Sequence, residues 1–113
     1  MKTWPLRFRA IDKSNFDALK SGVKSVETRA ATPKYRQIQP GDILAISCAG
    51  DTVCKEVKSV QVFPSVEAMF REIPMESVMP EARTLEDALR EYHSYPGYEE
   101  KLAEYGVIAL ELG

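Results

Sequence analysis

The sequence has few of the residues that build metal and disulfide sites. It contains two cysteines, Cys48 and Cys54, and one histidine, His93. Two cysteines are too few for a disulfide scaffold, and they lack the further cysteine and histidine partners that a zinc site requires. A histidine-dependent catalytic triad has a single candidate in His93, and a lone histidine at a helix end is more often solvated than catalytic. We therefore predict no metal and no cofactor.

Long apolar segments are also missing. No run approaches the roughly 18 apolar residues of a membrane-spanning helix, and the opening residues MKTWPLRFRA lack the apolar stretch of a signal peptide. The sequence has no glycine-rich phosphate loop, no dinucleotide-binding fingerprint and no nucleophile elbow. We therefore expect a cytoplasmic protein without a membrane partner.

The chain nevertheless has enough apolar residues for one hydrophobic core. It has 113 residues, of which 44% are hydrophobic and 28% charged, so we predict a single domain over residues 1–113. The net charge of −2 conceals an asymmetry: residues 1–58 carry eleven Lys/Arg and six Asp/Glu, or +5, and residues 59–113 carry four and eleven, or −7. This predicts either a surface with two faces of opposite sign or an ordinary spread of exposed charge.

Hydrophobic periodicity and turn residues predict a mixed fold. Ser14 with Asp17 resembles a helix-capping pair, Ser65 and Thr84 stand where N-caps are expected, and residues 39–42 suit a type II turn. The predicted strands cover residues 6–11, 25–32, 43–48, 53–63 and 107–112; helices follow Ser14, Ser65 and Thr84 and cover 98–105, with a loop at 74–83. This order indicates an α+β domain around a strongly curved, mostly antiparallel sheet or small barrel.

Two details of the central hairpin can be predicted. The apolar residues of the long strand switch from odd to even positions between Val57 and Val60, which predicts a bulge near Lys58 and Ser59. A three-residue loop over 49–51 would allow the two cysteines to face each other across the hairpin, although two reduced, half-buried thiols are the simpler expectation.

The most informative segment is GVKSVETR, residues 22–29. The glycine allows the chain to leave the preceding helix sharply, so Lys24 stands at the start of the next strand. Glu27 and Arg29 project from the same face of that strand, and the three charged side chains therefore converge. Such a cluster is either a surface ion-pair network, which contributes little stability, or part of a site.

This pattern, G-x-K-x-x-E-x-R after a short helix and before the Gly41-Asp42 turn and an apolar strand, resembles the ASCH domain. The long strand at 57–63 and the closing segment 105–110 also match, so the resemblance covers nearly the whole chain. It implies a small PUA-like β-barrel with flanking helices and a cleft beside the signature. In this family the cleft is proposed to bind RNA, and members include RNA-binding modules of transcription coactivators, a ribonuclease and a small amidohydrolase.

The resemblance therefore implies a cleft for RNA or a modified nucleoside, with a role in RNA metabolism or in the regulation of translation or transcription. Lys24 and Arg29 are expected to contact phosphate, and Glu27 either reads a base or holds Arg29. Tyr92 is expected in the core because of its helical spacing. The other candidates are the basic residues Arg7, Arg9, Lys34 and Arg36, and the stacking residues Tyr35, Tyr95 and Tyr98.

Two enzymatic alternatives stay open, and both depend on Lys24. The amidohydrolase branch of the family deacylates acetylated cytidine with a lysine, a threonine and a glutamate; Lys24 matches the lysine, but Glu27 stands in place of the threonine. If the chain is an enzyme, Lys24 and Glu27 are its candidate catalytic residues. The glutamate of that branch has three candidates here, which are Glu76, Glu81 and Glu86.

A ribonuclease would instead use Lys24 or Arg29 at the phosphate, with Ser94 or a tyrosine as hydrogen-bond partner. A third hypothesis makes the chain a protein-interaction module, in which the acidic segment Glu67–Glu104 binds a basic partner.

Overall fold

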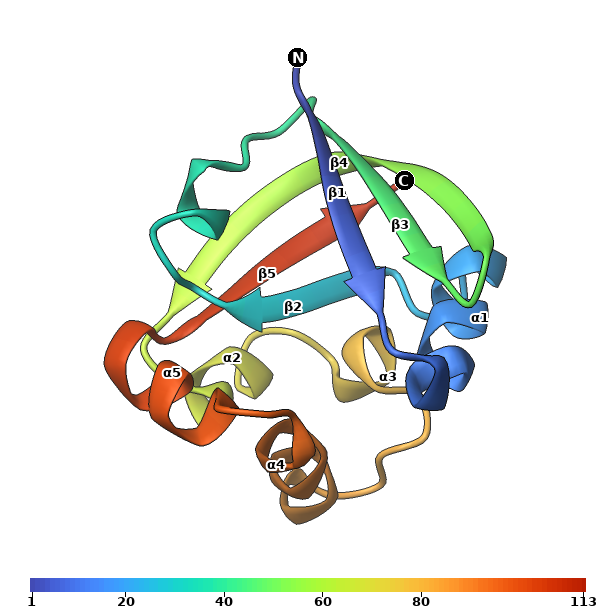
Figure 1. The fold of residues 1–113 in the computed structure, drawn as a ribbon. Coiled ribbons are helices and arrows are strands. Elements are labelled where there is room, and N and C mark those ends of the chain that lie inside the picture. The colour runs from blue at the N-terminus through green and yellow to red at the C-terminus, as the bar shows by residue number, and fades with distance from the viewer.

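The computed structural model describes residues 1–113 as a curved sheet with α-helices packed below it and beside it (Figure 1). The strands are β1 (Thr3–Phe8), β2 (Val26–Ala30), β3 (Ile43–Cys48), β4 (Asp51–Phe63) and β5 (Val107–Leu112). The helices are α1 (Lys13–Ser21), α2 (Val66–Phe70), α3 (Met75–Val78), α4 (Leu85–Ser94) and α5 (Tyr98–Tyr105), with 3-10 turns at Ala10–Asp12 and Tyr35–Gln37. None of the helices has the length and apolar character needed to cross a membrane.

The five strands form one mixed sheet in the order β1-β3-β4-β5-β2. β1 pairs with β3 in parallel, and the other three pairings are antiparallel. The predicted bulge is present as a register shift between Val57 and Ser59, so β4 bends and pairs first with β3 and then with β5. The sheet curls into a half-barrel whose two edge strands are β1 and β2, which confirms the predicted α+β, barrel-like fold.

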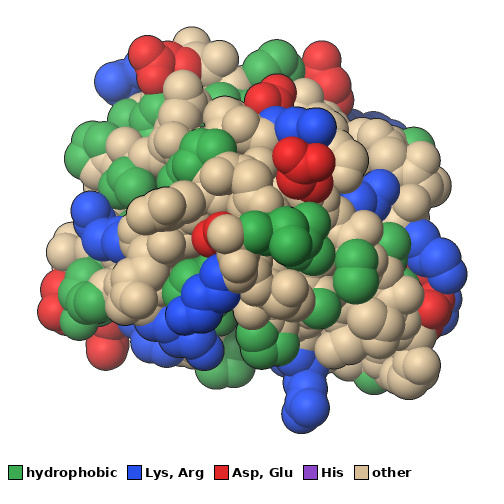
Figure 2. Space-filling model, turned by 90° about the horizontal axis from the view of Figure 1, so that it is seen from above, with side chains coloured by type: hydrophobic (Ala, Val, Ile, Leu, Met, Phe, Trp, Pro, Cys, Tyr) green, Lys and Arg blue, Asp and Glu red, His purple; other side chains and the backbone are tan.

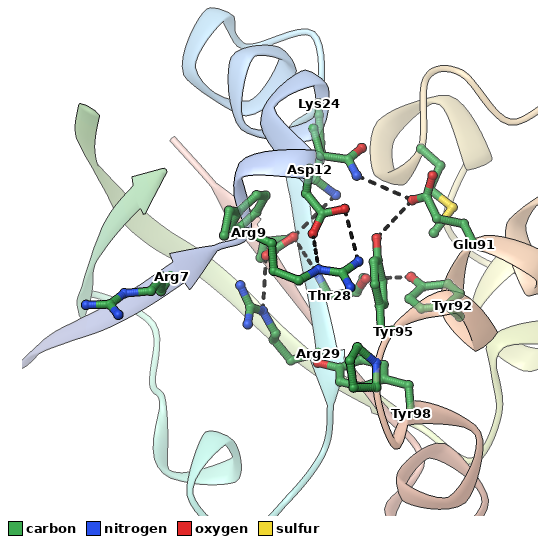
Figure 3. A pocket seen from close by; sticks show the side chains of 15 residues that line it. Arg7, Arg9, Asp12, Lys24, Thr28, Arg29, Glu91, Tyr92, Tyr95 and Tyr98 are labelled. Carbon is green, nitrogen blue, oxygen red and sulfur yellow. Dashed lines mark hydrogen bonds and ion pairs between the residues drawn. The ribbon is translucent and has the colours of Figure 1, made fainter. Parts of the chain in front are cut away.

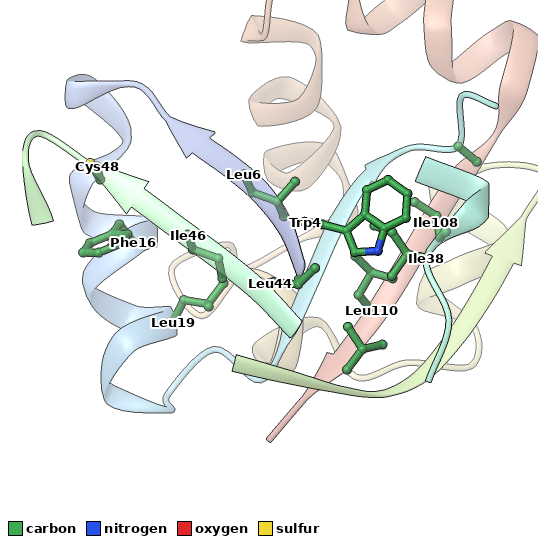
Figure 4. Close-up of a cluster of buried hydrophobic side chains, with 12 residues drawn as sticks. Trp4, Leu6, Phe16, Leu19, Ile38, Leu44, Ile46, Cys48, Ile108 and Leu110 are labelled. Atoms are coloured by element: carbon green, nitrogen blue, oxygen red, sulfur yellow. The ribbon is translucent and has the colours of Figure 1, made fainter. Parts of the chain in front are cut away.

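Two apolar clusters hold this arrangement. One fills the concave side of the sheet and is drawn in Figure 4, and the other joins the outer side of β2 and β5 to the helices. Strand β5 contributes to both clusters, because Ile108 and Leu110 face the first and Val107 and Ala109 face the second. The fully buried side chains of the second cluster include Met69, Val78 and Tyr92. The helices are therefore fixed to the sheet through β2 and β5.

The turn before β3 is tied to β1 by one carboxylate. Gly41 has a φ of +94°, and the backbone N–H of Asp42 donates to the carbonyl of Gln39 at 3.0 Å, as the predicted type II turn requires. The Asp42 carboxylate accepts hydrogen bonds from the Trp4 indole at 2.9 Å, and from the backbone N–H groups of Gln39 and Lys2 at 3.0 Å each. These hydrogen bonds hold the pKa of Asp42 below its ordinary value, and the bond from Trp4 has the largest effect.

The start of the chain differs from the sequence prediction. β1 covers Thr3–Phe8 rather than residues 6–11, and a 3-10 turn follows at Ala10–Asp12. Arg9 donates to the Asp12 carboxylate at 2.7 Å, a contact that a fully extended chain cannot make across three residues. α1 begins at Lys13, so Ser14 lies inside the helix and is not its cap; the predicted stop is correct, because Gly22 has a φ of +90°.

Three further predictions were wrong in detail. The hairpin loop is Ala49–Gly50, so Cys48 pairs with Asp51 and Cys54 with Ala45, and the two cysteines do not face each other. The predicted loop at 74–83 contains α3, and α2 is shorter than its apolar stripe. The predicted caps Ser65 and Thr84 are present, each accepting a backbone N–H at 3.1 Å.

We predict that Asp42→Ala lowers the urea midpoint of unfolding at pH 7, because three donors lose their acceptor. The pKa of Asp42 lies lower in the folded chain than in the unfolded chain. The Asp42 carboxylate therefore stabilises the folded chain above pH 3.8, the ordinary value of its pKa, and this stabilisation is lost as the pH falls through the lower pKa of the folded chain. Urea titrations of the wild type and of Asp42→Ala should show the difference between their midpoints narrowing below pH 3.8.

The matched control is Asp17→Ala, which removes an exposed carboxylate paired with Lys13 and should leave the midpoint nearly unchanged. Equal effects of the two substitutions at pH 7 would contradict the role given to Asp42.

Candidate functional site

One pocket lies where the half-barrel stays open, between the end of β1 and the edge of β2 (Figure 3). Its cavity volume is about 180 Å³. β1 and its turn contribute Arg7, Phe8, Arg9 and Asp12, and β2 with its approach contributes Lys24, Glu27, Thr28 and Arg29; α4 and the residues after it contribute Glu91, Tyr92, Tyr95, Pro96 and Tyr98. Asn15 of α1 and Met79, the residue after α3, complete it. The pocket thus joins three distant stretches of the chain.

β2 presents an unpaired backbone edge to this pocket. The N–H of Ala31 donates to the carbonyl of Gly106, and the N–H of Leu112 donates to that of Ser25, each at 2.9 Å. Odd-numbered residues of β2 therefore bond to β5, and the backbone groups of Val26, Thr28 and Ala30 point away from it. Lys24 donates to the carbonyl of Val26 and Glu27 accepts the N–H of Thr28, so these two side chains satisfy part of the free edge.

Lys24 is the deepest basic residue of the pocket, with only 5% of its surface exposed. Its ammonium donates to the carbonyl of Val26 at 2.8 Å and to that of Val78 at 2.6 Å, and it lies 3.4 Å from Oε1 of Glu27. The ammonium therefore has two backbone carbonyls as hydrogen-bond acceptors and Glu27 as its ion-pair partner. Burial lowers the pKa of Lys24, and the neighbouring Glu27 opposes this decrease. In this arrangement Lys24 connects β2 to α3.

Glu27 lies between two cations. Its Oε1 faces Lys24 and accepts the backbone N–H of Thr28 at 3.1 Å, and its Oε2 accepts Nε of Arg29 at 3.2 Å. The predicted convergence of Lys24, Glu27 and Arg29 is therefore present. The group is not a surface network, because Glu27 is only 4% exposed. Of the two roles considered for Glu27, its contacts match that of holding Arg29.

Arg29 differs from Lys24 in having donors to spare. It hydrogen-bonds the protein only through Nε, so its two terminal nitrogens keep their N–H groups for another acceptor. Its guanidinium lies over the Phe8 ring at 5.3 Å from the ring centroid. The ion pair and the ring together fix the guanidinium at the wall of the pocket.

Aromatic residues form the opposite wall. Tyr95 makes edge-to-face contacts with Tyr92 and Tyr98, at centroid separations of 6.2 and 5.3 Å, and the Arg9 guanidinium lies 5.3 Å from the Tyr95 centroid. The Tyr92 hydroxyl bonds to the Thr28 hydroxyl. Burial raises the pKa of Tyr92, Tyr95 and Tyr98, so all three hydroxyls stay protonated at neutral pH.

The structure separates the predicted site residues into two groups. The pocket brings together Arg7, Arg9, Lys24, Glu27, Arg29, Tyr95 and Tyr98. Four others do not line it: Tyr35 packs beside the first core cluster, Lys34 lies over the Tyr35 ring, Arg36 donates to the carbonyls of Ala31 and Tyr105, and Ser94 donates to the carbonyl of Glu91. The acidic candidates Glu76, Glu81 and Glu86 also do not line it.

Sequence reasoning missed the acidic residues Asp12 and Glu91 and the amide Asn15. Glu91 could have been found from the sequence. Ala88, Tyr92 and Tyr95 recur at helical spacing and form an apolar face, and Glu91 lies beside them at the edge of that face. Tyr92 is buried in the second cluster, as predicted, but its hydroxyl also reaches the pocket.

Charges of both signs line the pocket. Arg7, Arg9, Lys24 and Arg29 are balanced in part by Asp12, Glu27 and Glu91, which leaves one positive charge. The face of the molecule drawn in Figure 2 also carries basic and acidic side chains close together among apolar and neutral atoms. The pocket is therefore lined by individual charged groups of both signs and not by basic residues alone.

A fold of this kind with a charged pocket at the open edge defines a PUA-like domain, and comparison with known proteins gives its family. The family model for the ASCH domain matches residues 10–113. The chain therefore belongs to the ASCH domain family, which confirms the resemblance seen in the sequence.

Solved structures show the same fold. The crystal structure of the hypothetical protein PH0355 is 29% identical, with a TM-score of 0.84 over 99% of this chain and 97% of that one. The solution structure of protein PF0455 from Pyrococcus furiosus is 30% identical, with a TM-score of 0.75 over 97% of this chain and 94% of that one. No curated protein matches the chain.

The contacts of Lys24 predict a structural effect of its removal. Lys24→Met leaves the carbonyls of Val26 and Val78 without their donor and leaves Arg29 as the only cation beside Glu27, and breaking a buried pair costs about 3–5 kcal/mol. We expect a loss of about 3 kcal/mol in the free energy of unfolding, measured by urea denaturation. Lys13→Met, at an exposed lysine with one carboxylate partner, serves as control and should leave the free energy of unfolding nearly unchanged.

Proposed function

We propose that this ASCH domain binds single-stranded RNA and holds one nucleotide of it in the pocket between β1 and β2. The observation that carries the proposal is Arg29, whose guanidinium is fixed by Glu27 and Phe8 while its terminal N–H groups stay available. A fixed arginine with two free terminal nitrogens suits a phosphate or the acceptor edge of a base, since it donates in parallel to two oxygens. Membership of the ASCH family, for which RNA binding is proposed, supports this function.

The size of the pocket supports a single nucleotide. A cavity of about 180 Å³ is smaller than the roughly 300–1,000 Å³ of sites for drug-sized ligands. It therefore suits one base or nucleoside rather than a long stretch of chain. A base of single-stranded RNA can leave its neighbours and enter such a pocket, whereas a paired base first has to unstack.

Flat groups around the pocket support contact with a base. The guanidinium groups of Arg9 and Arg29 lie over the rings of Tyr95 and Phe8, and both guanidinium and aromatic planes can stack on unpaired bases. Arg7 is exposed at the pocket lining, where it can contact the phosphate of a neighbouring nucleotide.

The contacts of Lys24 support binding rather than hydrolysis. A lysine that acts as a base or nucleophile needs a neutral amine with a free electron pair, whereas Lys24 faces two carbonyls and a carboxylate, which all favour its ammonium form. The threonine of the amidohydrolase branch is replaced by Glu27, and that carboxylate favours the charged form of the lysine. Under this proposal we expect neither deacylation of acetylcytidine nor cleavage of RNA.

The test is the fluorescence anisotropy of a labelled single-stranded RNA, titrated with the wild type and with Arg29→Ala at low and near-physiological salt. We expect Arg29→Ala to weaken binding about tenfold, because one well-placed charged contact contributes roughly 1–3 kcal/mol. If Arg29 contacts phosphate, its removal also makes the dependence of affinity on salt less steep.

Arg71→Ala removes an exposed arginine of the same charge that does not line the pocket, and it should bind like the wild type. Equal losses in the two variants would mean that RNA follows the overall charge and not the pocket. An absence of RNA binding by the wild type at both salts would refute the proposal.

A further inference from the structure

Glu91 is the one carboxylate of the pocket that has no basic partner. Asp12 pairs with Arg9, and Glu27 pairs with Lys24 and Arg29. Glu91 instead accepts neutral hydrogen bonds, from the Tyr95 hydroxyl at 3.1 Å and from the Asn15 amide at 3.5 Å. Both bonds go to Oε2, as the two dashed lines that meet at Glu91 in Figure 3 show. The other oxygen, Oε1, makes no hydrogen bond to the protein.

This arrangement prepares Glu91 to accept hydrogen bonds from a ligand. Tyr95 follows Glu91 by four residues, so the two side chains lie on one face of the chain at the end of α4. Tyr95 is held by its contacts with Tyr92 and Tyr98, and Asn15 approaches from α1. Three segments thus fix a half-buried carboxylate at the pocket wall, and a carboxylate only accepts hydrogen bonds.

The pocket therefore offers donors at Arg29 and an acceptor at Glu91. Resting on the RNA-binding function above, we propose that the pocket selects guanine as the bound base, with Glu91 as the residue that reads it. The edge of guanine carries O6, an acceptor, next to two donors, the N1–H and the 2-amino group. In the proposed complex the guanine donors bond to Glu91, and the acceptor O6 faces the free N–H groups of Arg29.

The other bases match Glu91 less well. Adenine and cytosine place a ring nitrogen with a lone pair beside their amino group, and uracil places a carbonyl on each side of its single N–H. Each of these bases brings an acceptor toward the carboxylate, and two acceptors that face each other repel. A site built to accept hydrogen bonds rejects a ligand that lacks the donors, because its buried polar groups are then left unpaired.

The experiment measures the binding of labelled uridine pentamers in which only the central base varies among guanine, hypoxanthine, adenine, cytosine and uracil. We expect the guanine oligomer to bind at least about tenfold more tightly than those with adenine, cytosine or uracil. Hypoxanthine lacks the 2-amino group but keeps N1–H and O6, so its oligomer should fall in between. Anisotropy at one fixed salt concentration keeps the phosphate contribution equal across the series.

Two variants connect the preference to Glu91. Glu91→Gln replaces one oxygen by a donor and should reduce the guanine preference to under about threefold, because guanine loses an acceptor and the carbonyls of uracil no longer face a carboxylate. Tyr95→Phe removes only the hydroxyl that positions Glu91 and should also reduce the preference, so the test holds if Glu91→Gln does not fold. Glu99→Gln, at an exposed carboxylate of α5 outside the pocket, should keep it.

The possible results separate this inference from the function on which it rests. Equal binding of all five oligomers, or a guanine preference that survives both Glu91→Gln and Tyr95→Phe, overturns the role of Glu91 and leaves RNA binding in place. Failure of every oligomer to bind the wild type overturns RNA binding itself, and the base preference with it.

Discussion

The rest of this structure depends on the buried carboxylate of Glu27. A charge in the interior is costly unless it is paired and hydrogen-bonded, and Glu27 meets this requirement with Lys24 on one side, Arg29 on the other and the N–H of Thr28 between them. The same contacts close part of the free edge of β2. Through Lys24 they also reach the carbonyl of Val78 in α3. One side chain thus couples an edge strand, a short helix and the pocket wall.

The signature residues therefore divide their roles. Lys24 and Glu27 direct their hydrogen bonds and ion pairs to groups of the protein, and in the proposed function they act on a ligand through what they hold in place. Arg29 is the member of the group that has donors left for a ligand. A similar division applies across the pocket, where Tyr95 and Asn15 hold Glu91 and its second oxygen stays open. Arg29 and Glu91, which keep groups free toward the pocket, are thus each held in place by other side chains.

The parts of the fold that the sequence predicts well are those bounded by turn chemistry. β3 was predicted with its observed limits because Gly41 precedes it and a tight hairpin follows. The prediction placed β1 too late in the chain, at residues 6–11, because Pro5 argues against a strand that begins at Thr3. An edge strand tolerates a proline, since only one side of it is hydrogen-bonded. α3 has four residues, too few for a helical period to show.

For the site, sequence reasoning brought Lys24, Glu27 and Arg29 together, because residues on one strand face have a fixed spacing. It did not reveal that Lys24 donates to two backbone carbonyls, since one of them, that of Val78, lies 54 residues away. Glu91 was missed although helical spacing places it beside Tyr92 and Tyr95; only the approach of Asn15 from α1 depends on tertiary packing.

The assembly of the pocket from three distant stretches of chain has a consequence for how binding and folding are linked. Residues 7–15, 24–29 and 79–98 meet only when the parallel pairing of β1 with β3 and the docking of the helices are both complete. Contacts of such long sequence separation form late in folding. A partly folded chain has no pocket, so any occupant adds its binding energy to the native state alone. Resistance to heat and to proteolysis then becomes a general report of occupancy, whatever the occupant's chemistry.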